Sequence, residues 1–146
     1  MKSLFDPTAY EEIKARLEAL TNESAPTWGK MNVGQMVTHC QFPLKIALSS
    51  KPRKHKWNLI GFLFKKSLYN DRPWKQGLPT AKLAKITDEK DFIAERDKLT
   101  SMIDAFHAKK EQTEWQPHPM FGKFTPEQWG QLEYKHLDHH LRQFGV

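Results

Sequence analysis

Three histidines, His136, His139 and His140, lie close together near the end of the chain. On an α-helix successive residues turn by about 100°, so residues four apart lie one turn apart on the same face. His136 and His140 have this spacing, and both fall on the inward side marked by Trp129, whereas His139 falls at its edge. Two imidazoles stacked in this way can converge on one divalent metal ion.

A third histidine strengthens the metal interpretation. His39 is expected on the core side of an earlier helix, and helical bundles build metal sites from facing helices. Three imidazole ligands leave coordination positions for water or substrate, as catalytic sites do. The alternative is that these are ordinary core histidines with hydrogen-bond partners. Burial of their charged forms would cost free energy, whereas a metal ion binds the neutral ring.

Further residues are candidates for the surroundings of such a site. Glu133 flanks the same helical face, where it could be a fourth ligand, an acceptor for an imidazole N–H or an ordinary carboxylate. His118 stands between two prolines and could act as an acid or base, or be an exposed loop histidine. Trp28, Trp129 and Phe121 could wall a pocket or pack in the core.

Four helices are expected to position these residues. Hydrophobic spacing and end signals place them over 7–20, from 33 onward, over 88–110 and over 126–144. Strand signals are weak throughout. The sequence therefore predicts an all-α fold, an antiparallel four-helix bundle with a long crossover between the second and third helices, as a single domain over 1–146.

Signals at the helix ends support these boundaries. Asp6 is predicted to cap the first helix, and Asn32 and Thr125 should form capping boxes with glutamines three residues later. Pro43 should kink the second helix or end it early, because proline has no N–H to donate. One face of the last helix is expected to be solvated; its residues are Gln131, Lys135, Asp138 and Arg142.

The crossover is strongly basic. Ten of the 23 Lys and Arg residues, but only one of the 17 acidic residues, lie between Lys51 and Lys85. We expect a connector whose aromatic side chains pack on the bundle. The alternatives are a binding module for single-stranded nucleic acid or an anionic membrane surface, and a patch that attracts an anionic substrate. The residues concerned are Lys51, Arg53, Lys54, Lys56, Lys65 and Lys66, with Trp57 and Phe62.

Composition limits the class of protein. Hydrophobic residues make up 38% and charged residues 27%, which is typical of a globular chain. The single cysteine, Cys40, cannot form an internal disulfide, and it is read as a small buried residue and not as a nucleophile. The first residues lack the apolar core of a signal peptide, and the longest apolar run, 59–64, is too short to span a bilayer. We therefore expect a cytoplasmic location.

The sequence around the three proposed ligands resembles the DinB-like superfamily of four-helix metal-binding proteins. The first resembling element is Trp28-Gly29-Lys30-Met31-Asn32-Val33-Gly34-Gln35-Met36-Val37-Thr38-His39, and the second is His136-Leu137-Asp138-His139-His140-Leu141-Arg142-Gln143. The closing segment, from His118 to Gly145, is similar to an uncharacterised bacterial branch of that superfamily. The resemblance covers nearly the whole chain.

The resemblance implies a chemistry as well as a fold. It implies that His39, His136 and His140 bind nickel, zinc, iron or manganese, and that the protein is a homodimer, as many members are. It also implies transferase or isomerase chemistry with a low-molecular-weight thiol such as bacillithiol, mycothiol or glutathione. A metal lowers the pKa of a coordinated thiol, which would then attack a small-molecule substrate. Metal-dependent hydrolysis is the alternative. Binding of nucleic acid is not expected.

Overall fold

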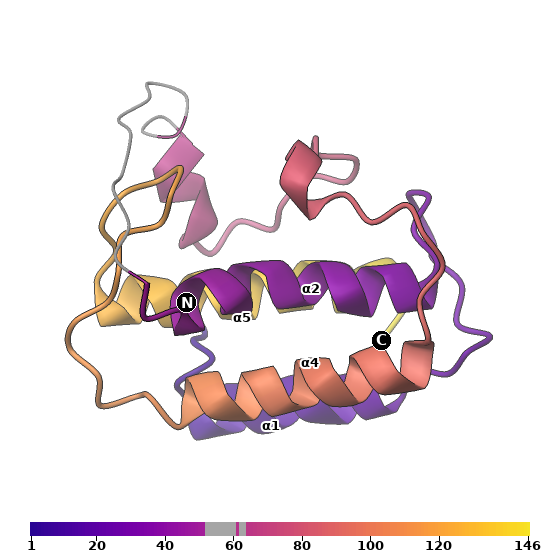
Figure 1. Ribbon diagram of the computed structural model, residues 1–146, viewed down its shortest axis with the longest axis horizontal. Helices are drawn as coiled ribbons and strands as arrows, with labels where there is room; N and C mark the ends of the chain where they lie inside the picture. Colours follow the sequence, from indigo (N-terminus) through magenta and orange to yellow (C-terminus); the bar gives the residue numbers. More distant parts are fainter. Residues whose placement is uncertain (52–60, 62–63) are drawn as a thin grey trace.

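Four α-helices dominate the computed structural model, which describes residues 1–51, 61 and 64–146 (Figure 1). They are α1 (Pro7–Glu18), α2 (Val33–Leu48), α4 (Phe92–His107) and α5 (Pro126–Gln143), with two short 3-10 helices, η1 (Lys66–Leu68) and η2 (Lys82–Ala84). Within the described residues there is no strand beyond an isolated bridge between His118 and Gly122. The predicted all-α bundle is confirmed.

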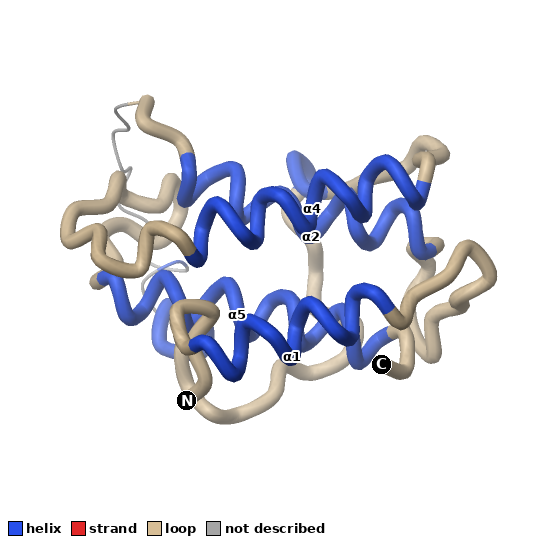
Figure 2. The backbone as a smooth tube through the Cα atoms, turned by 90° about the horizontal axis from the view of Figure 1, so that it is seen from below, coloured by secondary structure: helices blue, strands red, loops and turns tan. Residues whose placement is uncertain are grey.

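The helices form two layers (Figures 1 and 2). One layer pairs α2 with α4 and the other pairs α1 with α5, as seen from below in Figure 2. The crossover returns the chain along the bundle, so α2 and α4 run in the same direction, whereas α5 runs antiparallel to α2 (Figure 1). The contact between the two layers places α2 against α5, and this contact brings the histidines of the two helices together.

Two of the three N-caps predicted from the sequence are observed. Asn32 and Thr125 both form the predicted capping boxes, with Gln35 and Gln128. Asp6 precedes α1, but its carboxylate accepts from the Ser3 backbone N–H and does not cap the helix. Pro43 does not end α2 early, since the helix continues to Leu48, and the alternative of a kink at this residue stays a prediction. A proline removes one hydrogen bond, which the packing of α2 on its neighbours can offset.

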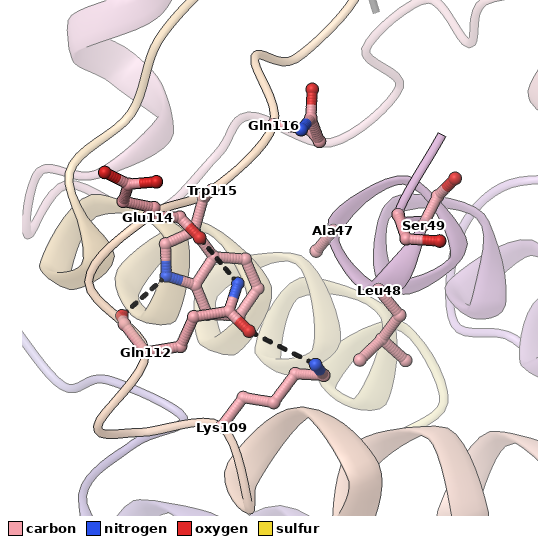
Figure 3. A pocket seen from close by; sticks show the side chains of 9 residues that line it. Ala47, Leu48, Ser49, Lys109, Gln112, Glu114, Trp115 and Gln116 are labelled. Atoms are coloured by element: carbon pink, nitrogen blue, oxygen red, sulfur yellow. Dashed lines mark hydrogen bonds between the residues drawn. The ribbon is translucent and has the colours of Figure 1, made fainter. Parts of the chain in front are cut away.

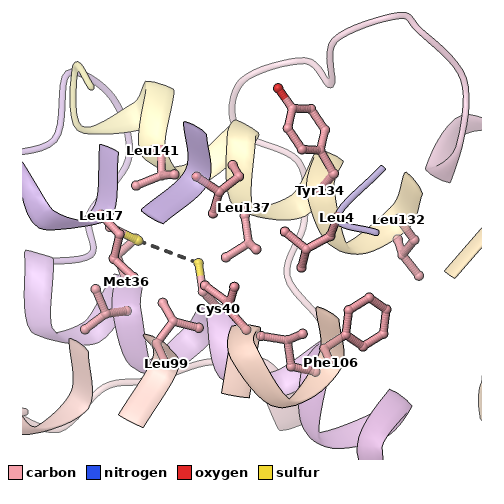
Figure 4. Packing of buried hydrophobic residues seen from close by; sticks show 14 of the residues in the cluster. Leu4, Leu17, Met36, Cys40, Leu99, Phe106, Leu132, Tyr134, Leu137 and Leu141 are labelled. Atoms are coloured by element: carbon pink, nitrogen blue, oxygen red, sulfur yellow. Dashed lines mark hydrogen bonds between the residues drawn. The ribbon is translucent and has the colours of Figure 1, made fainter. Parts of the chain in front are cut away.

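Apolar side chains from all four helices fill the space between the layers (Figure 4). Cys40 lies in this core, 1% exposed, with its Sγ 3.6 Å from the Met36 Sδ. The N-terminal segment closes one end, where the Phe5 ring stacks on Phe106 at 4.7 Å. The Leu4 backbone N–H donates to the Gly130 carbonyl on α5, a close approach that a side chain at position 130 would obstruct.

No helix in the described ranges is both long and apolar enough to cross a membrane.

The second half of the crossover, residues 64–84, packs on the bundle as predicted and is called the strap below. In Figure 1 it runs along the outside of α2 and α5. The Lys135 ammonium on α5 holds it, donating to the carbonyls of Ser67 and Asn70 and to the Asn70 Oδ1 at 2.7–2.8 Å. The prediction that Lys135 lies on a solvated face is therefore wrong: it is 6% exposed, because the strap covers it. Residues 52–60, 62 and 63 lie outside the described chain.

Candidate metal centre

Three histidines meet where α2 crosses α5. His39 comes from α2 and His136 and His140 from adjacent turns of α5, and one ring nitrogen of each lies within 4.8 Å of the others. All three side chains are buried. The Nε2 atoms of His39 and His136 are 3.2 Å apart. Two nitrogens bound to one zinc ion at a tetrahedral angle would be about 3.4 Å apart, so this spacing fits shared coordination.

Hydrogen bonds at Nδ1 orient two of the three rings. The His39 Nδ1 donates to the Ala84 carbonyl in η2 at 2.8 Å, which leaves the lone pair on Nε2. The His140 Nδ1 donates to the Gln143 Oε1 at 2.9 Å, and the Gln143 amide in turn donates to the Trp28 carbonyl at 2.7 Å. Acceptors at Nδ1 fix the tautomer in which Nε2 can bind a metal.

The third ring has a different environment. The His136 Nδ1 is buried and has no hydrogen-bond partner among the described residues. Glu133, one turn earlier on α5, is 0% exposed, and neither of its carboxylate oxygens has a partner there. Glu133 is not part of the group of ligand atoms within 4.8 Å, so its proposed role as a fourth ligand stays a prediction.

Burial controls the charge of these groups. Desolvation lowers the pKa of His39 and lowers that of His136 well below its usual range, with the neighbouring histidines adding to the effect on His136. Burial lowers the pKa of His140 to about 3. The three rings are therefore neutral at physiological pH, the form that binds a metal. Desolvation raises the pKa of Glu133 well above its ordinary value.

Aromatic side chains cover the histidines on their outer side. The Trp74 ring, carried by the strap, lies edge-on to His136 and His139, with centroids 6.0 and 5.6 Å away. Trp28 approaches His139 from the other side at 6.0 Å. Both tryptophans are half-buried. They form a wall beside His136 and His139 that limits the contact of these rings with water.

Other residues named from the sequence gather elsewhere. His118 is buried, contrary to the exposed-loop alternative, because it packs among aromatic rings at the start of α5. Its ring centroid lies 4.8 Å from Phe121 and 5.8 Å from Trp129, and its Nδ1 accepts from the N–H groups of Met120 and Phe121. Since Trp129 precedes His136 by two turns, this cluster is about 10 Å along α5 from the histidines. A catalytic role for His118 stays a prediction.

Cys40 has the surroundings expected of a core residue. It follows His39 on α2 but points into the apolar core beside Met36. Burial raises the pKa of its thiol well above the ordinary range, so little thiolate forms at neutral pH.

Three of the ten basic crossover residues, Arg53, Lys54 and Lys56, fall outside the described chain. Of the two described lysines near η1, Lys65 bonds to the Lys123 carbonyl and lies 4.7 Å above the Phe124 ring. Its contacts are those of a connector packed on the bundle. The anionic-partner alternatives for this segment stay predictions.

A cleft with a volume of about 290 Å³ opens at the C-terminal ends of α2 and α4, beside Trp115 (Figure 3). Several of its polar groups bond to one another: Lys109 donates to the Gln112 side chain, and the Trp115 indole N–H donates to the Gln112 carbonyl. None of the three histidines lines this cleft.

Three contributors to the site were not identified as such from the sequence. The role of the Ala84 carbonyl cannot be recognised from the sequence, because every residue has a backbone carbonyl. Trp74 lies in a stretch without periodicity, so no pattern assigned it to the site. Gln143 could have been found, because it falls on the inward face of the last helix one turn after His140.

One family model matches residues 2–145, and its description is "Protein of unknown function (DUF1569)". No curated protein and no solved structure matches the chain.

Proposed function

Since the chain belongs to the DUF1569 family, whose description names no activity, we propose a function from the site itself: a metal-dependent enzyme acting on a small molecule. His39, His136 and His140 would hold one divalent ion through Nε2. The observation that carries the proposal is the convergence of three buried, neutral imidazoles, two of them oriented by acceptors at Nδ1.

A catalytic ion fits this site better than a structural one. Three protein ligands are typical of catalytic centres, whereas structural zinc sites ordinarily have four. The core of the bundle is continuous, with large side chains such as Phe106 and Trp129 fully buried. A chain with such a core does not need a metal in order to fold.

The chain's own residues have separable roles in this proposal. The three histidines bind and position the ion, and Ala84 and Gln143 hold two of the rings in the ligating tautomer. Trp28 and Trp74 exclude water from one side. When bound, the ion supplies positive charge that lowers the pKa of a coordinated thiol or water.

Thiol-dependent group transfer is the reaction we propose, with hydrolysis as the competing outcome. The proposal extends to membership of the DinB-like superfamily. Two observations support it: one histidine on α2 faces a pair spaced by four on the last helix, and a long crossover joins α2 to α4. Nickel, zinc, iron and manganese all accept imidazole ligands, so the ligands do not select among them.

An activity assay tests this proposal. The metal-loaded protein would be incubated with chlorodinitrobenzene and glutathione, bacillithiol or mycothiol in turn, and with a nitrophenyl ester for hydrolysis. We expect thiol conjugation that disappears on chelation and in His39→Ala. His107→Ala is the control, since His107 lies at the end of α4, away from the site, where its ring bonds the Leu4 carbonyl of the N-terminal segment. Conjugation at equal rates in all variants, or ester hydrolysis alone, would overturn the transferase proposal.

A further inference from the structure

Unpartnered buried polar atoms concentrate on one helix. Within the described residues, six buried side-chain nitrogen and oxygen atoms have no hydrogen-bond partner, and five of them belong to α5. They include the Trp129 Nε1, both Glu133 oxygens and the His136 Nδ1. A buried polar group without a partner costs free energy, so several in one place call for an explanation.

Their spacing makes these groups complementary. Trp129 lies four residues before Glu133, and His136 lies three residues after it, so all three belong to neighbouring positions of one helix face. Side chains on a helix lean toward its N-terminus, which brings the His136 ring over the turn that carries Glu133. An indole N–H can only donate, and a carboxylate has two oxygens that accept.

In a metal centre of this kind the His136 Nδ1 becomes a hydrogen-bond donor that needs an acceptor. If the His136 Nε2 binds the ion beside the His39 Nε2, its Nδ1 carries the proton and must donate. His39 and His140 each already have an acceptor at this position. His136 is the one ligand of the three whose Nδ1 has none in the described chain.

The positive charge of a bound divalent ion is a second reason to assign this role to Glu133. Three neutral imidazoles leave the two positive charges of a divalent ion uncompensated inside the bundle. Among the described residues, Glu133 is the only acidic side chain that is fully buried. Asp138, the nearest acid after His136, is half-buried and bonds to Arg16 at 2.8 Å on the outer side of α5.

We propose that Glu133 is the positioning residue of the metal centre: when an ion binds, its carboxylate, which bonds to neither neighbour in this structure, turns to accept the Nδ1–H of His136 and offsets the charge of the ion, while its second oxygen accepts the Trp129 indole N–H. The inference rests on the proposed metal site but not on the proposed reaction. With these two bonds formed, one side chain would link the aromatic cluster at the start of α5 to the histidines that hold the ion.

Metal affinity and apo-protein stability together test this role. Zinc would be titrated into the full chain against a chromophoric chelator, for wild type, Glu133→Gln and Glu133→Leu. We expect zinc affinity to fall by about 10- to 100-fold in Glu133→Leu, the loss typical of an outer hydrogen-bond partner, and by less in Glu133→Gln, which keeps an acceptor. The metal-free Glu133→Leu protein should be as stable as wild type or more stable, because an unpartnered buried acid has been removed.

A control and a spectroscopic readout separate this role from a structural one. Gln41→Leu removes a polar side chain that is equally buried but bonds to Glu95 on α4, so it should leave zinc affinity unchanged. In the zinc-loaded protein, the His136 Nδ1–H should give a downfield proton resonance that shifts in Glu133→Gln and is lost to exchange in Glu133→Leu.

The outcomes distinguish the two proposals. Equal zinc affinity in wild type and Glu133→Leu, or an unmoved His136 resonance, would overturn the role of Glu133 and leave the metal site intact. Parallel losses of affinity and apo-protein stability would mean that Glu133 is only structural. If wild type binds no metal, the proposed function and this inference fail together. A bound metal without thiol transfer would contradict only the reaction.

Discussion

Burial keeps each of the three histidines neutral, and this has a consequence for stability in the metal-free protein. A ring whose pKa is lowered on folding takes up its proton more readily in the unfolded chain. As the pH falls below the unfolded pKa of about 6.5, protons therefore favour unfolding, and stability declines. For His140 the decline continues to about pH 3, the value to which burial lowers its pKa.

We predict that His140→Leu flattens this dependence. In the presence of a chelator, the free energy of unfolding of wild type should fall more steeply between pH 6.5 and 4.5 than that of the variant. The difference in slope should be about 1.4 kcal/mol per pH unit, corresponding to one proton. Urea denaturation at a series of pH values measures it. Glu133, whose raised pKa gives a slope of opposite sign, is present in both proteins and cancels. Identical slopes would show that His140 is not held neutral.

A second prediction concerns Gln143, the acceptor for His140. Gln143→Leu removes the hydrogen bond that orients the ring, so we expect zinc affinity to fall by about 10- to 100-fold. Isothermal titration in the presence of a competing chelator measures the change. Gln131→Leu is the control, because Gln131 bonds to Glu127 on the outer side of the same helix. Equal losses in both variants would point to a general perturbation of α5.

At the level of single residues, the sequence located the three histidines that converge, but only part of what surrounds and orients them. His39, His136 and His140 were found because helical spacing alone places them inward. The acceptor for His39 is a backbone carbonyl at residue 84, and the covering ring is Trp74. Both depend on how the strap folds back, which is a tertiary contact without a periodic signal.

The strap is the element that completes the site. It supplies the Ala84 carbonyl at one end and Trp74 in its middle, and Lys135 attaches it to α5. Local signals predicted the helices well, since caps such as those at Asn32 and Thr125 involve neighbours in sequence. They overestimated the third helix, predicted over 88–110 but observed as Phe92–His107, because Asp91 and not an earlier residue caps it.

We predict that Lys135→Met loosens the strap. The substitution leaves the Asn70 carbonyl without this donor and leaves the Ser67 carbonyl with the Trp74 indole N–H alone, at a cost of about 1–3 kcal/mol. Hydrogen exchange in the peptide covering 64–78 should accelerate, while exchange in the middle of α2 and α4 should change less. Arg142→Met, an exposed position on the same side of α5, is the control. Unchanged exchange in the strap would show that Lys135 does not hold it.

For the molecule as a whole, the two-layer bundle and its crossover determine where function can lie. The strap runs along the bundle on the α2–α5 side, so among the described residues it covers this side and not that of α1 and α4 (Figure 1). The all-α fold and the crossover could be predicted from the sequence, from the number of helices and the number of residues that separate the second from the third. The parallel course of α2 and α4 follows from the length of that crossover.

Metal content tests the central claim most directly. The chain would be purified without chelator and analysed by elemental mass spectrometry, with His136→Ala alongside and with thermal unfolding measured before and after chelation. We predict one divalent ion per chain in wild type, none in the variant, and a fall in Tm of about 5–10 °C on chelation if the ion is present at 100 times its Kd. A wild-type protein that contains no metal, and takes up none when nickel, zinc, iron or manganese is added, would contradict it.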